Sequence, residues 1–156
     1  MNSMNRELFN ELSLLFEKNG FSLFLVGGAV RDFLLKKENN DFDFVSDALP
    51  NDVKKFFPDG NYSFEKFGSC KIPFHNNMID IVTLRKEEYD NLFRTPKKII
   101  YTNSLYEDSL RRDFTINALY MDKNNKIYDF HNGINDLNNK IIKTIGDPNI
   151  RFKEDP

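Results

Sequence analysis

The spacing of apolar and polar positions predicts short helices and strands in mixed order. Between residues 6 and 18, apolar side chains recur every three or four positions, as in a helix with one buried face; they are Leu8, Phe9, Leu12, Leu15 and Phe16. Residues 23–26 form a short apolar run that fits a buried strand. The chain therefore begins with a packing helix and a strand, which ends at Gly27-Gly28 before a second helix.

Further along, the pattern continues as short elements separated by turn residues. His75 stands in a three-residue turn between two of the predicted strands, where a turn residue is expected rather than a metal ligand. The predicted elements are a short helix over 52–57, strands over 69–74 and 78–84, a long mobile loop over 86–106, a helix over 108–121, a strand over 126–130, a turn with a short helix over 133–138, an extended piece over 140–144 and a final helix beginning at residue 148. Together they predict an α/β fold.

Two carboxylates stand one pleat apart after the second helix. In a strand, Asp41 and Asp43 point to one face and Phe42 and Phe44 to the other. Close carboxylates repel each other unless a cation lies between them, and Mg²⁺ with phosphate oxygens completing its shell fits such a pair. A calcium loop is excluded because Val45 stands where a third oxygen ligand would be required.

The Gly27-Gly28 turn is a candidate phosphate site. Glycines let the backbone approach a ligand, and the start of a helix presents N–H groups to an anion. Arg31 would lie about one turn into this helix. A Gly-Gly pair alone is usually only a tight turn, but strand, turn, helix and Asp-x-Asp strand together make one unit that could hold a metal-bound triphosphate.

Asp80 is the third acidic candidate. It lies within the apolar run 78–82, where a carboxylate is unfavourable without a partner. If this strand lies beside the Asp-x-Asp strand, Asp80 could be a third active-site carboxylate. A structural salt bridge is the alternative.

In the predicted helix over 108–121, polar residues do not gather on one face. Arg112 falls among apolar positions, and so do Asp113 and Asn117, so all three need partners. A bound nucleotide would provide them. The alternative is an internal Arg–Asp network that only braces the helix.

Charge and composition limit the partners. The formal net charge of −2 gives little support for binding a nucleic acid through its phosphates, and the small lysine pairs, such as Lys36-Lys37, are typical of solvated faces. The single cysteine, Cys70, excludes an internal disulfide and is interpreted as a packing residue. No apolar run has the length of a membrane span and no signal peptide is recognisable, so a cytoplasmic protein without membrane contact is expected.

Several ordered motifs resemble one family. They are Gly27-Gly28-Ala29-Val30-Arg31-Asp32, Asp41-Phe42-Asp43, the run 111–118 that begins Arg-Arg-Asp-Phe-Thr, Gly146-Asp147-Pro148 and the run 151–156. The sequence is similar to the catalytic head of bacterial CCA-adding tRNA nucleotidyltransferases and poly(A) polymerases, which are class II, polymerase-β-like enzymes. The resemblance implies a small mixed sheet flanked by helices, and an enzyme that joins nucleotides from CTP and ATP to the 3′ end of tRNA, not DNA, with Mg²⁺.

The resemblance also implies residue roles. Asp41, Asp43 and Asp80 would be catalytic, the first two as metal ligands, and the nucleotide would be bound by Gly27, Gly28, Arg31, Arg112, Asp113, Asn117 and Asp155. The rival functions are poly(A) addition to other RNA, and nucleotide binding without turnover.

The expected organisation is one head domain over residues 1–156. In the resembled family a helical C-terminal portion selects the base and holds the tRNA, and here the last motif is cut at 154–156. An isolated head, a shortened chain and a split protein with a separate C-terminal RNA-binding portion all fit the sequence.

Overall fold

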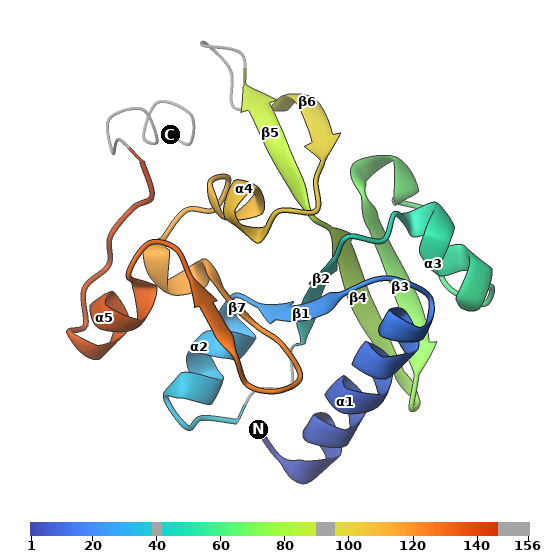
Figure 1. Ribbon diagram of the computed structural model, residues 1–156, viewed down its shortest axis with the longest axis horizontal. Helices are drawn as coiled ribbons and strands as arrows, with labels where there is room; N and C mark the ends of the chain where they lie inside the picture. The colour runs from blue at the N-terminus through green and yellow to red at the C-terminus, as the bar shows by residue number, and fades with distance from the viewer. Residues whose placement is uncertain (39–41, 90–95, 147–156) are drawn as a thin grey trace.

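The fold is organised around one mixed β-sheet. The structure, a computed structural model, describes residues 1–38, 42–89 and 96–146. Within these ranges a six-stranded sheet has the spatial order β3-β4-β2-β1-β7-β8, in which β2 and β4 are parallel and the other neighbours antiparallel (Figure 1). The strands are β1 Leu23–Val26, β2 Asp43–Ser46, β3 Ser69–Phe74, β4 Asn77–Thr83, β7 Leu119–Met121 and β8 Ile127–Asp129. The predicted α/β fold with a small mixed sheet is confirmed.

Helices and a separate hairpin cover the sheet. Figure 1 shows α1 and α2 on one side of β1, and α4 with the β5–β6 hairpin on the other. The bounds are α1 Ser3–Lys18, α2 Gly28–Leu34, α3 Pro50–Phe56, α4 Leu105–Ser109, α5 Gly133–Asn138, the 3₁₀ turns η1 Glu65–Phe67 and η2 Thr115–Asn117, and the hairpin strands β5 Arg85–Tyr89 and β6 Pro96–Tyr101.

Helix α1 begins and packs as its sequence predicts. Asn2 caps it, because its side-chain oxygen accepts a hydrogen bond from the Asn5 backbone N–H at 2.8 Å. The Phe9 ring packs against Phe44 of β2, with 5.4 Å between ring centroids. Since neighbouring side chains of a strand alternate, α1 covers the face of the sheet opposite to Asp43.

The two faces of the sheet differ in how much apolar surface they bury. The face under α1 carries the larger hydrophobic cluster, to which α2 and α3 also contribute. The opposite face carries a smaller cluster of four buried residues, Val26, Val45, Leu84 and Tyr120. This second face therefore keeps room for polar groups.

Most predicted elements are confirmed, with small shifts at their ends. They are the helices predicted over 6–18, 52–57 and 133–138 and the strands predicted over 23–26, 69–74, 78–84 and 126–130. His75 lies in the turn between β3 and β4, where its φ of 51° and the φ of 62° at Asn76 are left-handed. The helix predicted from residue 148 lies outside the described residues.

The long loop predicted over 86–106 is wrong in the described part. Arg85 pairs with Tyr101 in an antiparallel hairpin, and α4 follows at Leu105. The charged run after Arg85 conceals the alternation that a half-buried strand usually shows. Pairing with β6, which sequence periodicity does not reveal, stabilises this strand.

The helix predicted over 108–121 is also wrong. Helix α4 ends at Ser109, a 3₁₀ turn follows, and Leu119–Met121 forms β7. This strand pairs with both β1 and β8, so tertiary pairing overrides local helical preference. The helical positions predicted for Arg112, Asp113 and Asn117 do not apply.

Two smaller expectations concern Cys70 and membranes. Cys70 is buried without a disulfide, and burial, with a smaller effect of Asp80, raises the pKa of its thiol to about 12. A protonated, enclosed thiol fits the packing role.

Among the described helices, none is long and apolar enough to cross a membrane.

Replacing Leu12 with Ala should destabilise the fold, because Leu12 is fully buried in the larger cluster. Loss of a buried leucine side chain leaves a cavity and costs about 2–5 kcal/mol of unfolding free energy. The exposed Leu14 of the same helix provides the control, since Leu14→Ala should change stability by less than about 0.5 kcal/mol. Urea unfolding measures both, and equal losses would contradict the assigned buried face.

Candidate active site

Two carboxylates meet on the sheet face opposite to α1. Asp43 at the start of β2 pairs in register with Asp80 of the parallel strand β4, so their side chains point to the same face. The strand that carries Asp80 therefore lies beside the strand that carries Asp43, which is the condition for Asp80 to be a third active-site carboxylate. Asp41 lies outside the described residues.

Asp80 also has a cationic neighbour. The Nζ atom of Lys71, on β3, lies 3.7 Å from an Asp80 carboxylate oxygen, and both side chains are about half exposed. A solvated pair of this kind contributes about 0–1 kcal/mol. The salt bridge considered as the alternative thus exists, but it is too weak to explain a carboxylate at this position by itself.

A cavity of about 260 Å³ opens at these carboxylates. Acidic groups from β2 and β4 and guanidinium groups from the segments after β4 and α4 line it. Its described lining is Val26, Gly27, Asp43, Phe44, Val45, Asp80, Val82, Arg85, Arg111 and Arg112. Carboxylates can hold a cation and arginines an anion, so the cavity suits a metal-bound polyphosphate.

The glycine turn borders this cavity and leads into α2. Gly27 has φ 72° and ψ −135°, a conformation open to glycine because other residues would carry a Cβ into the backbone. A Cβ on Gly28 would lie 3.4 Å from Nη2 of Arg31. Nη1 of Arg31 donates a hydrogen bond to Oδ1 of Asn117 at 3.0 Å. The fold thus joins the glycine motif to a residue 86 positions later.

A buried aspartate holds two of the cavity arginines. Asp108 has no exposed surface, and its Oδ2 accepts hydrogen bonds from Nη2 of Arg112 at 3.0 Å and from the Tyr120 hydroxyl at 2.6 Å. Its Oδ1 accepts from Nε of Arg111 at 3.0 Å and from the Arg85 backbone N–H at 3.0 Å. The internal Arg–Asp network considered for Arg112 is therefore present.

The pKa values of this network follow from burial and close charges. Burial alone would raise the pKa of Asp108, but Arg111 and Arg112 lower it overall. Burial alone would lower the pKa of Arg112, but Tyr120 and Asp108 raise it. Arg111 has a lowered pKa because burial and the adjacent Arg112 outweigh Asp108, although a guanidinium remains protonated at neutral pH. One carboxylate between two guanidinium groups leaves a cationic wall on the cavity.

Sequence reasoning missed three members of the site, Arg85, Arg111 and Asp108. Arg85 begins β5, separated from the end of β4 only by Leu84, and in the described part of the chain its buried Nε has no hydrogen-bond partner. Its other guanidinium nitrogens contact the Phe67 carbonyl oxygen at 2.6 Å and a Glu87 carboxylate oxygen at 2.8 Å. An arginine at the end of a strand that carries an aspartate was the available signal.

Not every predicted residue reaches the cavity. Asp113 is exposed and is not among the described lining residues, while its backbone oxygen accepts a hydrogen bond from the Ile145 N–H at 3.0 Å. Asp155 lies outside the described residues. The structure thus brings together Gly27, Asp43, Asp80 and Arg112 directly, with Arg31 and Asn117 at the adjoining turn.

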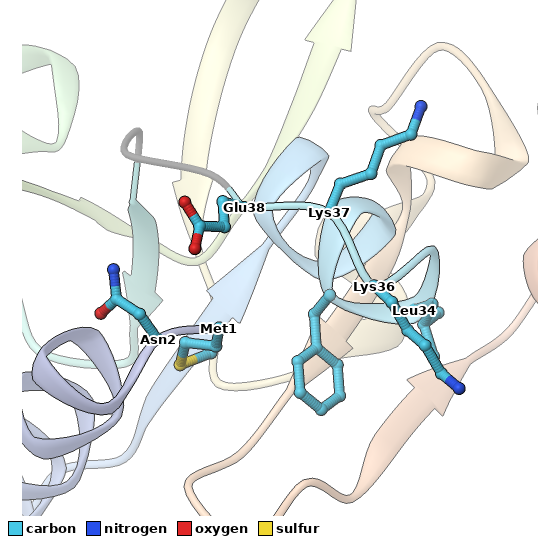
Figure 2. Close-up of a pocket in the computed structure, with 7 residues that line it drawn as sticks. Met1, Asn2, Leu34, Lys36, Lys37 and Glu38 are labelled. Carbon is cyan, nitrogen blue, oxygen red and sulfur yellow. The ribbon is translucent and has the colours of Figure 1, made fainter.

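A larger cavity, of about 550 Å³, lies between the start of α1 and the end of α2. Figure 2 shows Met1 and Asn2 on one side of it and Leu34, Lys36 and Lys37 on the other, with both lysine ammonium groups directed away from Met1. Its described lining lacks the paired carboxylates and the arginines. The cavity of about 260 Å³ is the candidate active site because it brings carboxylates and guanidinium groups together, which the described lining of the larger cavity does not.

Comparisons with known proteins agree with this geometry. The model of the poly(A) polymerase head domain family matches residues 23–143. The CCA-adding enzyme of Staphylococcus epidermidis is 35% identical over 155 residues, which are 97% of this chain and 39% of that enzyme. This chain belongs to the poly(A) polymerase head domain family, as the motifs indicated.

Solved structures show the same fold. The structure of the Bacillus stearothermophilus CCA-adding enzyme in complex with CTP matches with a TM-score of 0.85 and 31% identity, over 99% of this chain and 37% of that one. A tRNA nucleotidyltransferase complexed with a primer tRNA and an incoming ATP analog matches with a TM-score of 0.67 and 29% identity, over 86% and 39%. The chain spans about two fifths of the length of the curated relatives that it matches.

Replacing Asp108 with Asn should lower the unfolding free energy at pH 7 by about 3–5 kcal/mol, because two buried guanidinium groups lose their counter-charge. The lowered pKa of Asp108 stabilises the fold above the unfolded value near 3.8, and this contribution disappears as pH falls through the folded value. The difference from wild type should therefore shrink below pH ~4. Urea unfolding from pH 7 to pH 3 tests this, with the exposed Asp59→Asn as control; a constant difference would contradict it.

Proposed function

We propose that this chain carries the catalytic centre of a CCA-adding tRNA nucleotidyltransferase. It would join CMP and AMP, from CTP and ATP, to the 3′ end of tRNA with release of pyrophosphate. The observation that carries the proposal is the cavity in which the in-register pair Asp43 and Asp80 faces Arg111 and Arg112. Relatives bound to CTP, and to a primer tRNA with an ATP analog, support the substrates. We place the reaction in the cytoplasm, where these substrates meet.

The donor set fits Mg²⁺. Asp43 and Asp80 offer carboxylate oxygens in an open polar cavity, and no described group of three or more His, Cys, Asp or Glu side chains could hold a metal alone. Mg²⁺ is typically held by one or two carboxylates together with substrate phosphates and water. Asp41 and Asp43 would be its protein ligands, as predicted. When bound, the ion would neutralise developing charge on the transferring phosphate.

The order of the strands supports a proposal in which the two substrates lie on separate sides of the carboxylates. Gly27 follows β1, Asp43 begins β2 and Asp80 lies on β4, and these strands are neighbours in that order. The triphosphate would lie at the glycine turn, with Arg31 holding phosphate oxygens. The acceptor hydroxyl would then approach from the β4 side, beside Asp80.

The reaction on these groups is a simple displacement. The 3′ oxygen of the RNA forms a bond to the α-phosphorus, the bond from that phosphorus to the β-phosphate oxygen breaks, and pyrophosphate leaves. We assign the proton of the 3′ hydroxyl to the Asp80 carboxylate. Arg111 and Arg112, held by Asp108, supply fixed positive charge to the nucleotide without having to reorganise.

Most of the grip on tRNA is proposed to come from residues other than these. The formal net charge of −2 leaves little basic surface for a long RNA, whose binding depends on lysine and arginine contacts to phosphates. Asp155 lies outside the described residues, and we propose from the family resemblance alone that it helps to select the incoming base.

Replacing Asp43 or Asp41 with Ala should abolish CMP transfer to a tRNA that lacks its 3′ nucleotides, with a rate loss of at least ~100-fold. Each change removes a carboxylate at the reacting phosphate. Asp59→Ala, on an exposed turn, is the control and should retain the rate. Gel-resolved single-turnover extension measures all three. A wild-type chain that binds CTP but extends no RNA would favour a binding module, and an active Asp43→Ala would refute the site.

Replacing Arg31 with Ala should weaken CTP binding in Mg²⁺ by about 10- to 150-fold, the value of one charge-assisted bond of roughly 1.5–3 kcal/mol. Binding of cytidine should change little, because it has no phosphate. Asn117→Ala tests whether Arg31 acts only by holding Asn117. Lys37→Ala, on the exposed segment after α2, is the control. Calorimetry decides: equal losses for CTP and cytidine would show a structural role.

A further inference from the structure

Three exposed aromatic rings lie in and around the η1 turn. Phe64, which directly precedes η1, is 56% exposed, Phe67 at the end of η1 is 50% exposed, and Tyr101 on β6 is 38% exposed. Tyr101 packs against Gly68, where an added Cβ would lie 2.8 Å from its ring. The term η1 surface is used here for Phe64, Lys66, Phe67 and Tyr101.

The η1 surface combines aromatic and basic groups. Nζ of Lys66 lies 5.1 Å from the centroid of the Phe67 ring. Glu65 is the acidic residue of the same turn. Half-exposed rings with a lysine are the pattern by which proteins bind single-stranded nucleic acid, because bases stack on the rings and the cation lies near the phosphates.

This surface is connected to the cavity by direct contacts. The Phe67 carbonyl oxygen accepts a hydrogen bond from Nη1 of Arg85, which lines the cavity, at 2.6 Å. The Gly68 carbonyl oxygen accepts one from the Thr83 N–H of β4 at 2.8 Å. The backbone of the η1 turn therefore contacts both β4 and Arg85, a residue that lines the cavity. In Figure 1 the segment between α3 and β3 lies next to the β5–β6 hairpin.

The direction of the reaction assigns this side to the acceptor. In phosphoryl transfer the attacking and leaving oxygens are roughly in line. If the pyrophosphate leaves from the glycine turn beside β1, the RNA 3′ oxygen must come from the opposite side, past Asp80. The nucleotides that precede this oxygen would then extend along the side of the cavity that Arg85 lines, toward the η1 surface.

We propose that the η1 surface stacks the single-stranded bases at the 3′ end of the acceptor RNA, with Phe64 and Phe67 beneath bases and Lys66 near the phosphodiester backbone. The inference rests on the proposed function, because it concerns the RNA of that reaction. It adds an RNA-binding role for residues that the nucleotide site does not use.

The test compares two RNA hairpins, one with a three-nucleotide single-stranded 3′ end and one blunt, each labelled with fluorescein at the 5′ end. Anisotropy titrations with the full chain give the affinity ratio of overhang to blunt RNA. The wild-type chain should prefer the overhang by about tenfold or more, and Phe64→Ala/Phe67→Ala should abolish that preference. Phe64→Leu/Phe67→Leu, which keeps apolar contact but removes the rings, should lose most of it.

Two controls separate this result from misfolding. CTP affinity in Mg²⁺ should be unchanged in both double variants, and Ile142→Ala, an exposed apolar residue away from η1, should keep the overhang preference. An unchanged overhang-to-blunt ratio in both double variants, or no preference in wild type, would overturn the proposal and would fit a surface that docks a protein instead.

The same protein preparations distinguish failure of the surface from failure of the proposed function. If wild type transfers CMP while the overhang preference is insensitive to both rings, the surface is wrong and the function stands. If the rings determine overhang binding but no CMP is transferred, the surface stands as an RNA contact and the function is wrong.

Discussion

The parallel pairing of β2 with β4 is the constraint on which the site depends. Its register sets Asp43 opposite Asp80 and turns both to the face that α1 leaves open. Because side chains alternate along a strand, a slip of one residue would turn Asp43 into the core and Phe44 out of it. The Phe9–Phe44 contact and the larger hydrophobic cluster oppose that slip. The core thus protects the register, and the register places the carboxylates.

The other wall of the cavity is held by charge instead of apolar packing. Asp108 has no exposed surface and binds Arg111, Arg112 and Tyr120 together, so both guanidinium groups are held in place by the fold itself. A buried carboxylate is tolerated because every neighbour donates to it. For Arg112 the sequence left two alternatives, a ligand-binding role and an internal Arg–Asp network. The two are compatible, because Arg112 bonds to Asp108 and also lines the cavity.

Sequence patterns were reliable where each element is stabilised mainly by its own residues. The period of apolar side chains identified α1, and the apolar run before Gly27 identified β1. In both cases the spacing of apolar residues within the segment itself shows which side chains are buried. The motifs indicated the family, which the comparisons show. The metal and phosphate site inferred from the Asp-x-Asp spacing and the glycine turn stays a prediction. The elements β5, β6 and β7 were missed because their pairing partners lie far away in the chain or carry no regular alternation.

The sequence by itself therefore determined the fold class and the family, and it singled out Asp43 and Gly27-Gly28 as candidate site residues. Only the tertiary structure decided which cations face those carboxylates. Arg31 meets Asn117 across 86 positions, and Arg85 meets the η1 turn through a backbone oxygen, contacts that no local pattern encodes. The physical reason is that periodicity reports which side of an element is buried, whereas the partner across the sheet is fixed by strand order and register.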